Sequence, residues 1–173
     1  LALGSWAAFQ PMGDEAMVMG DLVLTHDEVN PVLSRLLASG FTITALHNHL
    51  LRSSPATMYM HIAGHGDPVK LAAALRQALS ASRTPLAAPQ SPSASAAASR
   101  LDLDVAALNR LMGGEGKTAG GILQYSFPRA ERLMDGDMET PPTMGTATAI
   151  NFQPTGDGRA AITGDFVLVA NEV

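Results

Sequence analysis

Histidine is the residue type whose placement in this sequence most clearly suggests chemistry. Four of the five histidines lie in two short strings, His47-Asn48-His49 and His61-Ile62-Ala63-Gly64-His65. Side chains alternate between the two faces of a β-strand, so the histidines within each string project to the same side. Because the two strings are expected to pair as a hairpin, we predict that three or four imidazoles converge on one patch.

Such a patch is suited to a transition metal. Neutral imidazole binds zinc, copper, nickel and iron, and three nitrogens with an open fourth position are the pattern of a catalytic zinc site. The chain has no cysteine, so histidine or carboxylate must supply the ligands. We therefore predict a site for zinc or another divalent transition metal, of the kind that metal-dependent hydrolases use to activate water. Its predicted ligands are His47, His49, His61 and His65.

A structural interpretation of the same histidines competes with this prediction. In that interpretation they are polar side chains on the solvated face of an antiparallel hairpin, and the opposite face supplies the core. His65, which lies between Gly64 and Gly66, also fits a turn. The residues expected in the core are Leu46, Leu50, Met58 and Met60.

A metal site of this kind also needs a carboxylate, as a further ligand or as a general base. The candidates in neighbouring elements are Asp21, Glu28 and Asp67. An acidic residue at a helix start is stabilised by the helix dipole, however, and that favours a structural role for Glu28. Asp67 precedes Pro68 and also fits a helix N-cap.

Several other functions are disfavoured by composition and motifs. The formal charge is −5 and no basic stripe is present, so nucleic acid is not an expected partner. No apolar run approaches the roughly 20 residues that a transmembrane helix needs. The string Gly113-Gly114-Glu115-Gly116-Lys117-Thr118 lacks the spacing of a phosphate-binding loop and follows a predicted helix instead of a strand.

The elements that must position the histidines follow from hydrophobic spacing. Asp27 is the expected N-cap of the first helix, and Gly40 the left-handed residue at its end. The first half of the chain predicts a strand over 16–24, a helix over 27–40, strands over 41–50 and 57–63, and a helix from Asp67 to Leu79. The second half predicts a helix over 105–112 and strands over 121–127, 146–152 and 160–169.

The two halves of the chain also repeat one another. Four strings recur in the same order and at nearly the same spacing: Phe9-Gln10-Pro11 as Phe152-Gln153-Pro154, Gly20-Asp21 as Gly164-Asp165, Val23-Leu24 as Val167-Leu168, and Glu28-Val29 as Glu172-Val173. The repeat predicts an α+β unit of order α-β-β-β-α-β-β-α. Its later part is a ββαββα arrangement, an antiparallel sheet with helices packed on one face.

Neither copy of this unit is complete. Residues 1–82 form the closing part of the first repeat, and residues 101–173 form the opening part of the second. A Pro/Ala/Ser-rich tract between them predicts a linker over residues 83–100. Two arrangements fit this pattern, one circularly permuted unit or parts of two tandem units. Incomplete units leave open sheet edges, which allow a homo-oligomer.

Several strings resemble the LppY/LpqO family of bacterial exported proteins and lipoproteins, whose function is unknown. They are Glu28-Val29-Asn30-Pro31-Val32, Thr44-Ala45-Leu46-His47-Asn48-His49, Met60-His61, Ser126-Phe127-Pro128-Arg129, Met144-Gly145 and Gly164-Asp165-Phe166-Val167-Leu168. The resemblance covers nearly all of the chain except the linker. It implies two tandem copies with residues beyond both ends, and export to the periplasm or the cell surface.

Two functional hypotheses follow from the sequence. The first is an exported metal-binding protein with its site on the histidine-rich hairpin, acting as a metal-dependent hydrolase. The second is a non-catalytic module that binds a small-molecule ligand or assembles with other chains.

Overall fold

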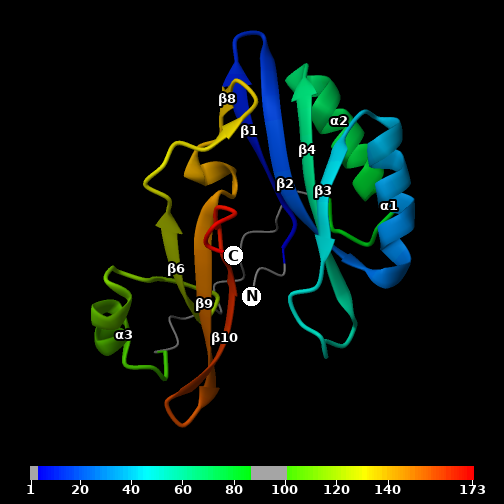
Figure 1. The fold of residues 1–173 in the computed structure, drawn as a ribbon. Helices are drawn as coiled ribbons and strands as arrows, with labels where there is room; N and C mark the ends of the chain where they lie inside the picture. The colour runs from blue at the N-terminus through cyan, green and yellow to red at the C-terminus, as the bar shows by residue number, and fades with distance from the viewer. Residues whose placement is uncertain (1–3, 87–100) are drawn as a thin grey trace. The chain divides into compact units, whose positions relative to one another are not determined.

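The structure is a computed structural model that describes residues 4–86 and 101–173. The first of these ranges belongs to one compact unit and the second to another. Each unit combines α-helix with an antiparallel sheet (Figure 1). The predicted α+β class is therefore confirmed.

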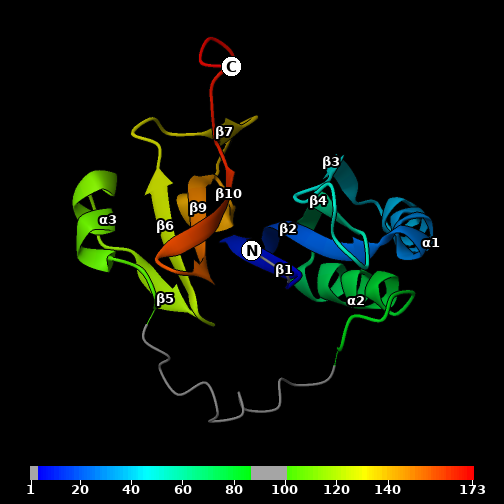
Figure 2. The ribbon, with the colours of Figure 1, turned by 90° about the horizontal axis from the view of Figure 1, so that it is seen from below.

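The first unit has the order ββαββα, and its four strands form one antiparallel sheet in the order β1-β2-β4-β3. Figures 1 and 2 show both helices on the same face of this sheet. This is the predicted sheet with helices packed on one side. The elements are β1 (Trp6–Met12), β2 (Glu15–Thr25), α1 (His26–Ala38), β3 (Thr42–His47), β4 (Thr57–Gly66) and α2 (Pro68–Leu79).

The core of the first unit lies between the sheet and its two helices. Alternate residues of each strand face the helices, and the apolar stripe of each helix packs onto them. The buried cluster takes Leu22 and Leu24 from β2, Met60 and Ile62 from β4, Val32 and Leu36 from α1, and Leu71 and Leu75 from α2.

The ends of the helices of this unit are set by local hydrogen bonds. The N-cap of α1 is Thr25, not Asp27 as predicted, because the Glu28 carboxylate accepts a hydrogen bond from the Thr25 backbone N–H at 2.9 Å and closes a capping box. Gly40 has φ of 83°, the left-handed conformation expected after the helix. Asp67 caps α2 by accepting from the backbone N–H groups of Val69 and Lys70, each at 2.9 Å.

The second unit has a sheet of order β10-β9-β6-β5 and one α-helix, which Figure 2 shows beside β6 and β5. Its core is smaller, with Leu123, Tyr125 and Phe152 buried and Leu108 and Met112 of the helix packed against them. The elements are α3 (Val105–Met112), β5 (Lys117–Ala119), β6 (Ile122–Pro128), the short pair β7 (Met134–Asp135) and β8 (Met138–Glu139), a 3-10 turn at Pro142–Met144, β9 (Ala147–Gly156) and β10 (Arg159–Asp165).

The last strand is shorter than the predicted strand over 160–169. Among the described residues β10 pairs only with β9, and that pairing ends at Asp165. Residues 166–169 therefore have no ladder to join. In β2 of the first unit, by contrast, the four residues from Leu22 to Thr25 pair with β4.

Part of the predicted linker contacts the first unit. The backbone N–H of Arg83 donates to the Glu28 carboxylate at 2.8 Å, and the side chain of Leu86 packs against the buried cluster. Residues 87–100, the rest of the predicted linker, lie outside the described residues. In the part of the chain that the structure describes, no helix is both long and apolar enough to cross a membrane.

The packing of α1 supplies a test of the first core. Leu36 is fully buried, whereas its neighbour Leu37 is 52% exposed. We expect Leu36→Ala to lower the free energy of unfolding by roughly 2–5 kcal/mol, because it leaves a cavity. Leu37→Ala should change it by less than about 0.5 kcal/mol. Urea denaturation of the full chain, followed by circular dichroism, measures both, and equal losses would contradict this packing.

Candidate functional site

The candidate site lies on the face of the first sheet that is turned away from the helices. Met60 and Ile62 of β4 belong to the helix-side core, so Tyr59 and His61, which alternate with them, point to the opposite face. Asp21 of β2 is the register partner of His61, and His47 of β3 is the register partner of Tyr59. Three strands therefore bring their polar side chains to one place.

The two central imidazoles meet directly. His47 Nε2 and His61 Nε2 lie 3.0 Å apart, and the two rings are nearly perpendicular, with an angle of 88° between their planes. Without a third group, one ring must donate a proton to the other. The same His61 Nε2 is 3.7 Å from Asp21 Oδ2. His61 Nε2 therefore has both a second imidazole nitrogen and a carboxylate oxygen beside it.

Burial differs sharply between the members of this group. The His61 side chain is 42% exposed, whereas that of Asp21 is only 10% exposed. Solvent or a ligand can reach the imidazole from outside, and the carboxylate is held at the base of the site. A buried carboxylate is costly unless it has a partner, and His61 is a partner that the sheet register supplies.

His49 joins the group from outside the sheet. Strand β3 ends at His47, three residues earlier than the predicted strand. The ring of His49 nevertheless lies 5.0 Å from that of His47, and it stacks on Tyr59 at 3.6 Å with an angle of 4° between the rings. Tyr59 was not among the residues predicted for the site. Its position two residues before His61 on one strand is the signal that places it on the same face.

His65 lies apart from the other three. It is in β4 rather than in a turn, four residues beyond His61. That spacing separates the two Cα atoms by roughly 13 Å along a strand. His65 instead faces Glu15 across an exposed ion pair of 3.4 Å, and such pairs contribute little to stability. The structure therefore brings together His47, His49 and His61 but does not bring His65 to them.

The competing interpretation of the hairpin is only partly matched. Met60 is fully buried and Met58 packs against the same cluster, as that interpretation expected. Leu46 was expected in the core but is 43% exposed. Its strand β3 is at the edge of the sheet, where one side has no neighbouring strand to cover it.

Glu28 and Asp67, the other two candidate carboxylates, have structural roles. Burial alone would raise the pKa of the Glu28 carboxyl, but hydrogen bonds from the backbone N–H groups of Thr25 and Arg83 outweigh burial and hold that pKa below its ordinary value of 4.5. Asp67 caps α2. Asp21 is thus the candidate that lies in the histidine cluster.

The geometry of this cluster can be compared with that of a metal centre. In a tetrahedral zinc site, Zn–N bonds of about 2.0–2.1 Å place neighbouring ligand atoms about 3.3 Å apart. The two distances from His61 Nε2, 3.0 Å to His47 Nε2 and 3.7 Å to Asp21 Oδ2, lie on either side of that value. As the side chains lie, however, no group of three or more His, Asp or Glu residues within the described ranges is arranged to hold a metal ion.

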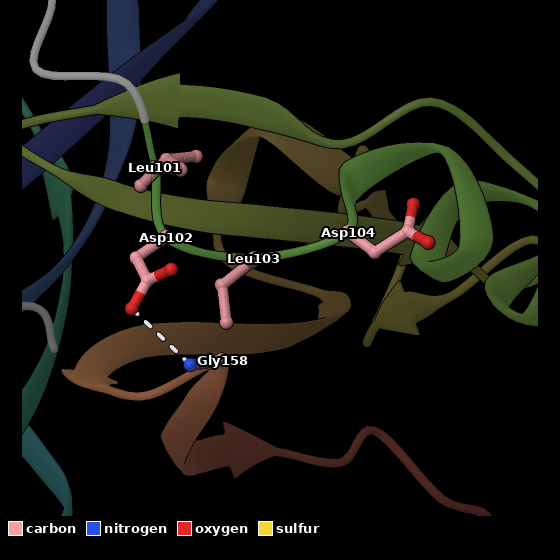
Figure 3. Close-up of a pocket in the computed structure, with 5 residues that line it drawn as sticks. All are labelled: Leu101, Asp102, Leu103, Asp104 and Gly158. Atoms are coloured by element: carbon pink, nitrogen blue, oxygen red, sulfur yellow. Dashed lines mark hydrogen bonds between the residues drawn. The ribbon is translucent and has the colours of Figure 1, made fainter.

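The second unit has a separate open pocket, lined by Leu101, Asp102, Leu103, Asp104 and Gly158 (Figure 3). Both of its carboxylates have structural partners. Asp102 accepts from the Gly158 backbone N–H at 3.2 Å, and Asp104 caps α3 by accepting from Ala107 N–H at 2.9 Å. Figure 3 shows Asp104 turned toward α3 and away from Asp102. We assign no chemistry to this pocket.

The second unit also contains a cluster of one arginine and two glutamates, which was not predicted from the sequence. Arg129 donates to Glu131 at 2.7 Å and to Glu172 at 2.6 Å, and its side chain is only 14% exposed. These hydrogen bonds raise the pKa of Arg129 and lower the pKa values of both carboxyl groups. Arg129 also donates to the Val167 carbonyl, so it fastens the segment that follows β10.

The fold and the site together define an α+β protein that carries a histidine and carboxylate cluster on the face of an antiparallel sheet that is turned away from its helices. The family model described as Domain of Unknown Function (DUF1259) matches residues 1–81 and 106–173, and the chain belongs to this family. No curated protein and no solved structure matches the chain. The family match does not test the resemblance to the LppY/LpqO family, which stays a prediction.

The pKa of Glu28 gives a pH-dependent prediction. Because the folded-state pKa is depressed, its contribution to stability is present above pH 4.5 and is lost as the pH falls through the lower, folded-state value. Glu28→Gln should therefore lower the free energy of unfolding at pH 7 by roughly 1–2 kcal/mol. The variant should also lose less stability than the parent chain below pH 4.5.

Urea denaturation across a pH series measures this difference. The exposed Glu115, for which the structure gives no hydrogen bond or ion pair, provides the matched control in Glu115→Gln. Parallel pH profiles for the parent chain and Glu28→Gln would contradict the structural role assigned to Glu28.

Proposed function

We propose that this protein binds a divalent transition metal, with zinc as the first candidate, through His47 and His61 on the face of its first sheet that is turned away from the helices. The observation that carries the proposal is the approach of the two Nε2 atoms to 3.0 Å. Two lone pairs at that separation repel unless a proton or a cation lies between them. A metal ion is the cation that neutral imidazole nitrogens prefer.

Asp21 is the carboxylate of the proposed site. Its Oδ2 atom is 3.7 Å from His61 Nε2, and the side chains would have to rearrange for all three donor atoms to bind one ion. If Asp21 does not reach the ion, its position beside an imidazole is that of an outer-shell partner, which orients a ligand and increases its basicity. Both roles depend on the same β2–β4 register.

His49 and His65, which the sequence analysis also predicted as ligands, have less support. The His49 ring stacks flat on Tyr59, so it would have to leave that stack in order to bind the same metal ion as His47. His65 has Glu15 as its neighbour at the far end of the strand. We therefore assign the metal to the His47–His61 pair and treat His65 as the internal control.

A metal held by two imidazoles and one carboxylate would leave coordination positions for water. Such a water has a lowered pKa and is the nucleophile of many hydrolytic enzymes. Hydrolysis is thus the reaction class that the proposed donor set favours. Export to the periplasm or cell surface stays a prediction that rests on the resemblance to the LppY/LpqO family.

Metal binding by tag-free protein tests the proposal. We expect the full chain to bind one equivalent of Co²⁺ with the visible absorption of a tetrahedral site, and Zn²⁺ to displace it. His47→Ala and His61→Ala should each weaken binding by more than the roughly 10–100-fold typical of losing an outer-shell partner. Asp21→Asn should weaken it by at least that range.

The histidines outside the pair are the controls for this experiment. His65→Ala and His26→Ala should bind Co²⁺ as the parent chain does, because His65 faces Glu15 and His26 is the first residue of α1. Equal, weak binding by the parent chain and by His47→Ala would show that no metal site exists there.

A second candidate function is binding of a small molecule without a metal. It is favoured by the absence, within the described ranges, of any group of three side chains already placed for a metal. In this case the exposed His61 and the stacked His49–Tyr59 pair would contact the ligand by hydrogen bonds and ring stacking. The Co²⁺ titration separates the two candidates, since this one predicts no tetrahedral spectrum.

A further inference from the structure

Two hairpins, one in each unit, have the same register. In the first unit β1 pairs with β2, and in the second β9 pairs with β10. Corresponding pairs are Phe9 with Val18 and Phe152 with Ile162, then Trp6 with Asp21 and Ala149 with Asp165. The glycines before the two aspartates also correspond. A Cβ on Gly20 would meet the Trp6 carbonyl oxygen at 2.6 Å, and one on Gly164 would meet that of Ala149 at 2.9 Å.

The hydrogen bonds beyond the two hairpins correspond as well. The backbone N–H of Val23 donates to Ser5 Oγ at 2.9 Å, and that of Val167 donates to Thr148 Oγ1 at 3.0 Å. The Glu28 carboxylate accepts from Thr25 N–H, and the Glu172 carboxylate accepts from Val169 N–H at 3.0 Å. The chain therefore leaves β2 and β10 along similar paths.

The outer edges of these two strands differ. In the first unit β4 pairs with β2 from Ala16 to Thr25, and the last four residues of β2 pair with β4 alone. In the second unit the described residues provide no strand on the outer edge of β10. The segment 166–169, which corresponds to the end of β2, is accordingly not a strand.

Burial differs in the same way. Val18, Leu22 and Leu24 of β2 are 0%, 1% and 1% exposed, because α1, α2 and β4 enclose them in one cluster. Their counterparts Ile162, Phe166 and Leu168 are 61%, 65% and 48% exposed. Three large apolar side chains along one edge are an interaction surface rather than a normal solvated strand.

We infer that the β10 edge, with Ile162, Phe166 and Leu168, is the docking surface for an α-β-β-α segment of the kind that residues 30–86 form in the first unit. The first unit shows how this occupant fits a matching edge. A strand like β4 would extend the β10 ladder through residue 169, and the helices would cover the three apolar side chains. Removal of their apolar surface from water supplies the driving force.

The occupant has a defined side-chain pattern. On the side of β4 that faces the helices, the residues paired with β2 are Met58, Met60, Ile62 and Gly64. A small residue is favoured at Gly64, because a Cβ there would make tight contacts with the side chains of Val18, Leu71 and Phe41 at 3.2–3.3 Å. A segment that docks on β10 should therefore present large apolar residues opposite Phe166 and Leu168 and a small residue opposite Ile162.

Joining a second copy of residues 30–86 directly after Val173 tests this inference. Val173 corresponds to Val29, so the appended copy continues as Asn30 continues in the first unit. Trp6→Phe removes the chain's one tryptophan, and Phe166→Trp then introduces a single indole that reports on the surface. We expect a blue shift of the emission of this indole, and loss of its quenching by acrylamide, when the segment is present.

The control carries Ile62→Asp in the appended copy only, which should abolish the shift. Hydrogen exchange on the extended chain with Phe166 intact gives a second readout, and the backbone N–H groups of residues 166–169 should become protected. Unchanged emission and exchange on extension would overturn the inference. So would an equal blue shift with the Ile62→Asp copy, or a shift that depends on protein concentration, which would assign the surface to a second chain.

Discussion

The antiparallel pairing of β2 with β4 is the interaction on which both the core and the site of the first unit depend. Ten consecutive residue pairs run from Ala16–Gly66 to Thr25–Thr57. Since side chains alternate along a strand, this register sends Leu22, Leu24, Met60 and Ile62 to the helices. It sends Asp21 and His61 to the other face. A slip of one residue would exchange the two sets and destroy core and site together.

The two faces of this sheet use polar groups in different ways. On the helix side, carboxylates stand at helix ends, where Glu28 and Asp67 accept backbone hydrogen bonds. On the other face, Asp21 is buried beside the His61 imidazole. A carboxylate in that position is tolerated where hydrogen bonds or a charged partner compensate its burial. The acids at the helix ends stabilise the fold, and Asp21 lies where a ligand of the imidazoles would bind.

Much of this arrangement could be predicted from the sequence, and the failures have physical causes. Hydrophobic spacing located α3 at its observed bounds and placed His47 and His61 on one face, because both follow from local periodicity. The N-cap of α1 was predicted at Asp27 instead of Thr25, because the capping box depends on the side chain of Glu28, three residues after the cap. The role of Tyr59 and the separation of His65 from the cluster depend on pairing between strands distant in sequence. Local patterns do not encode those distances.

The length of β10 was mispredicted for a related reason. Residues 166–169 are an apolar run typical of a strand, but among the described residues they lack the neighbour that β4 provides for β2. A strand needs a partner as well as a pattern. The repeat between the two halves was visible in the sequence. Only the structure shows that corresponding residues differ so strongly in burial.

Nitrogen NMR of the histidine rings during a Zn²⁺ titration tests the central claim most directly, because it reports which ring nitrogen binds the ion. The account predicts that Nε2 of His47 and Nε2 of His61 shift together at one equivalent of zinc. The rings of His26 and His65 should stay unchanged. Uniform small shifts of all five histidines, or a shift of His65 with His61 unmoved, would contradict the proposed convergence.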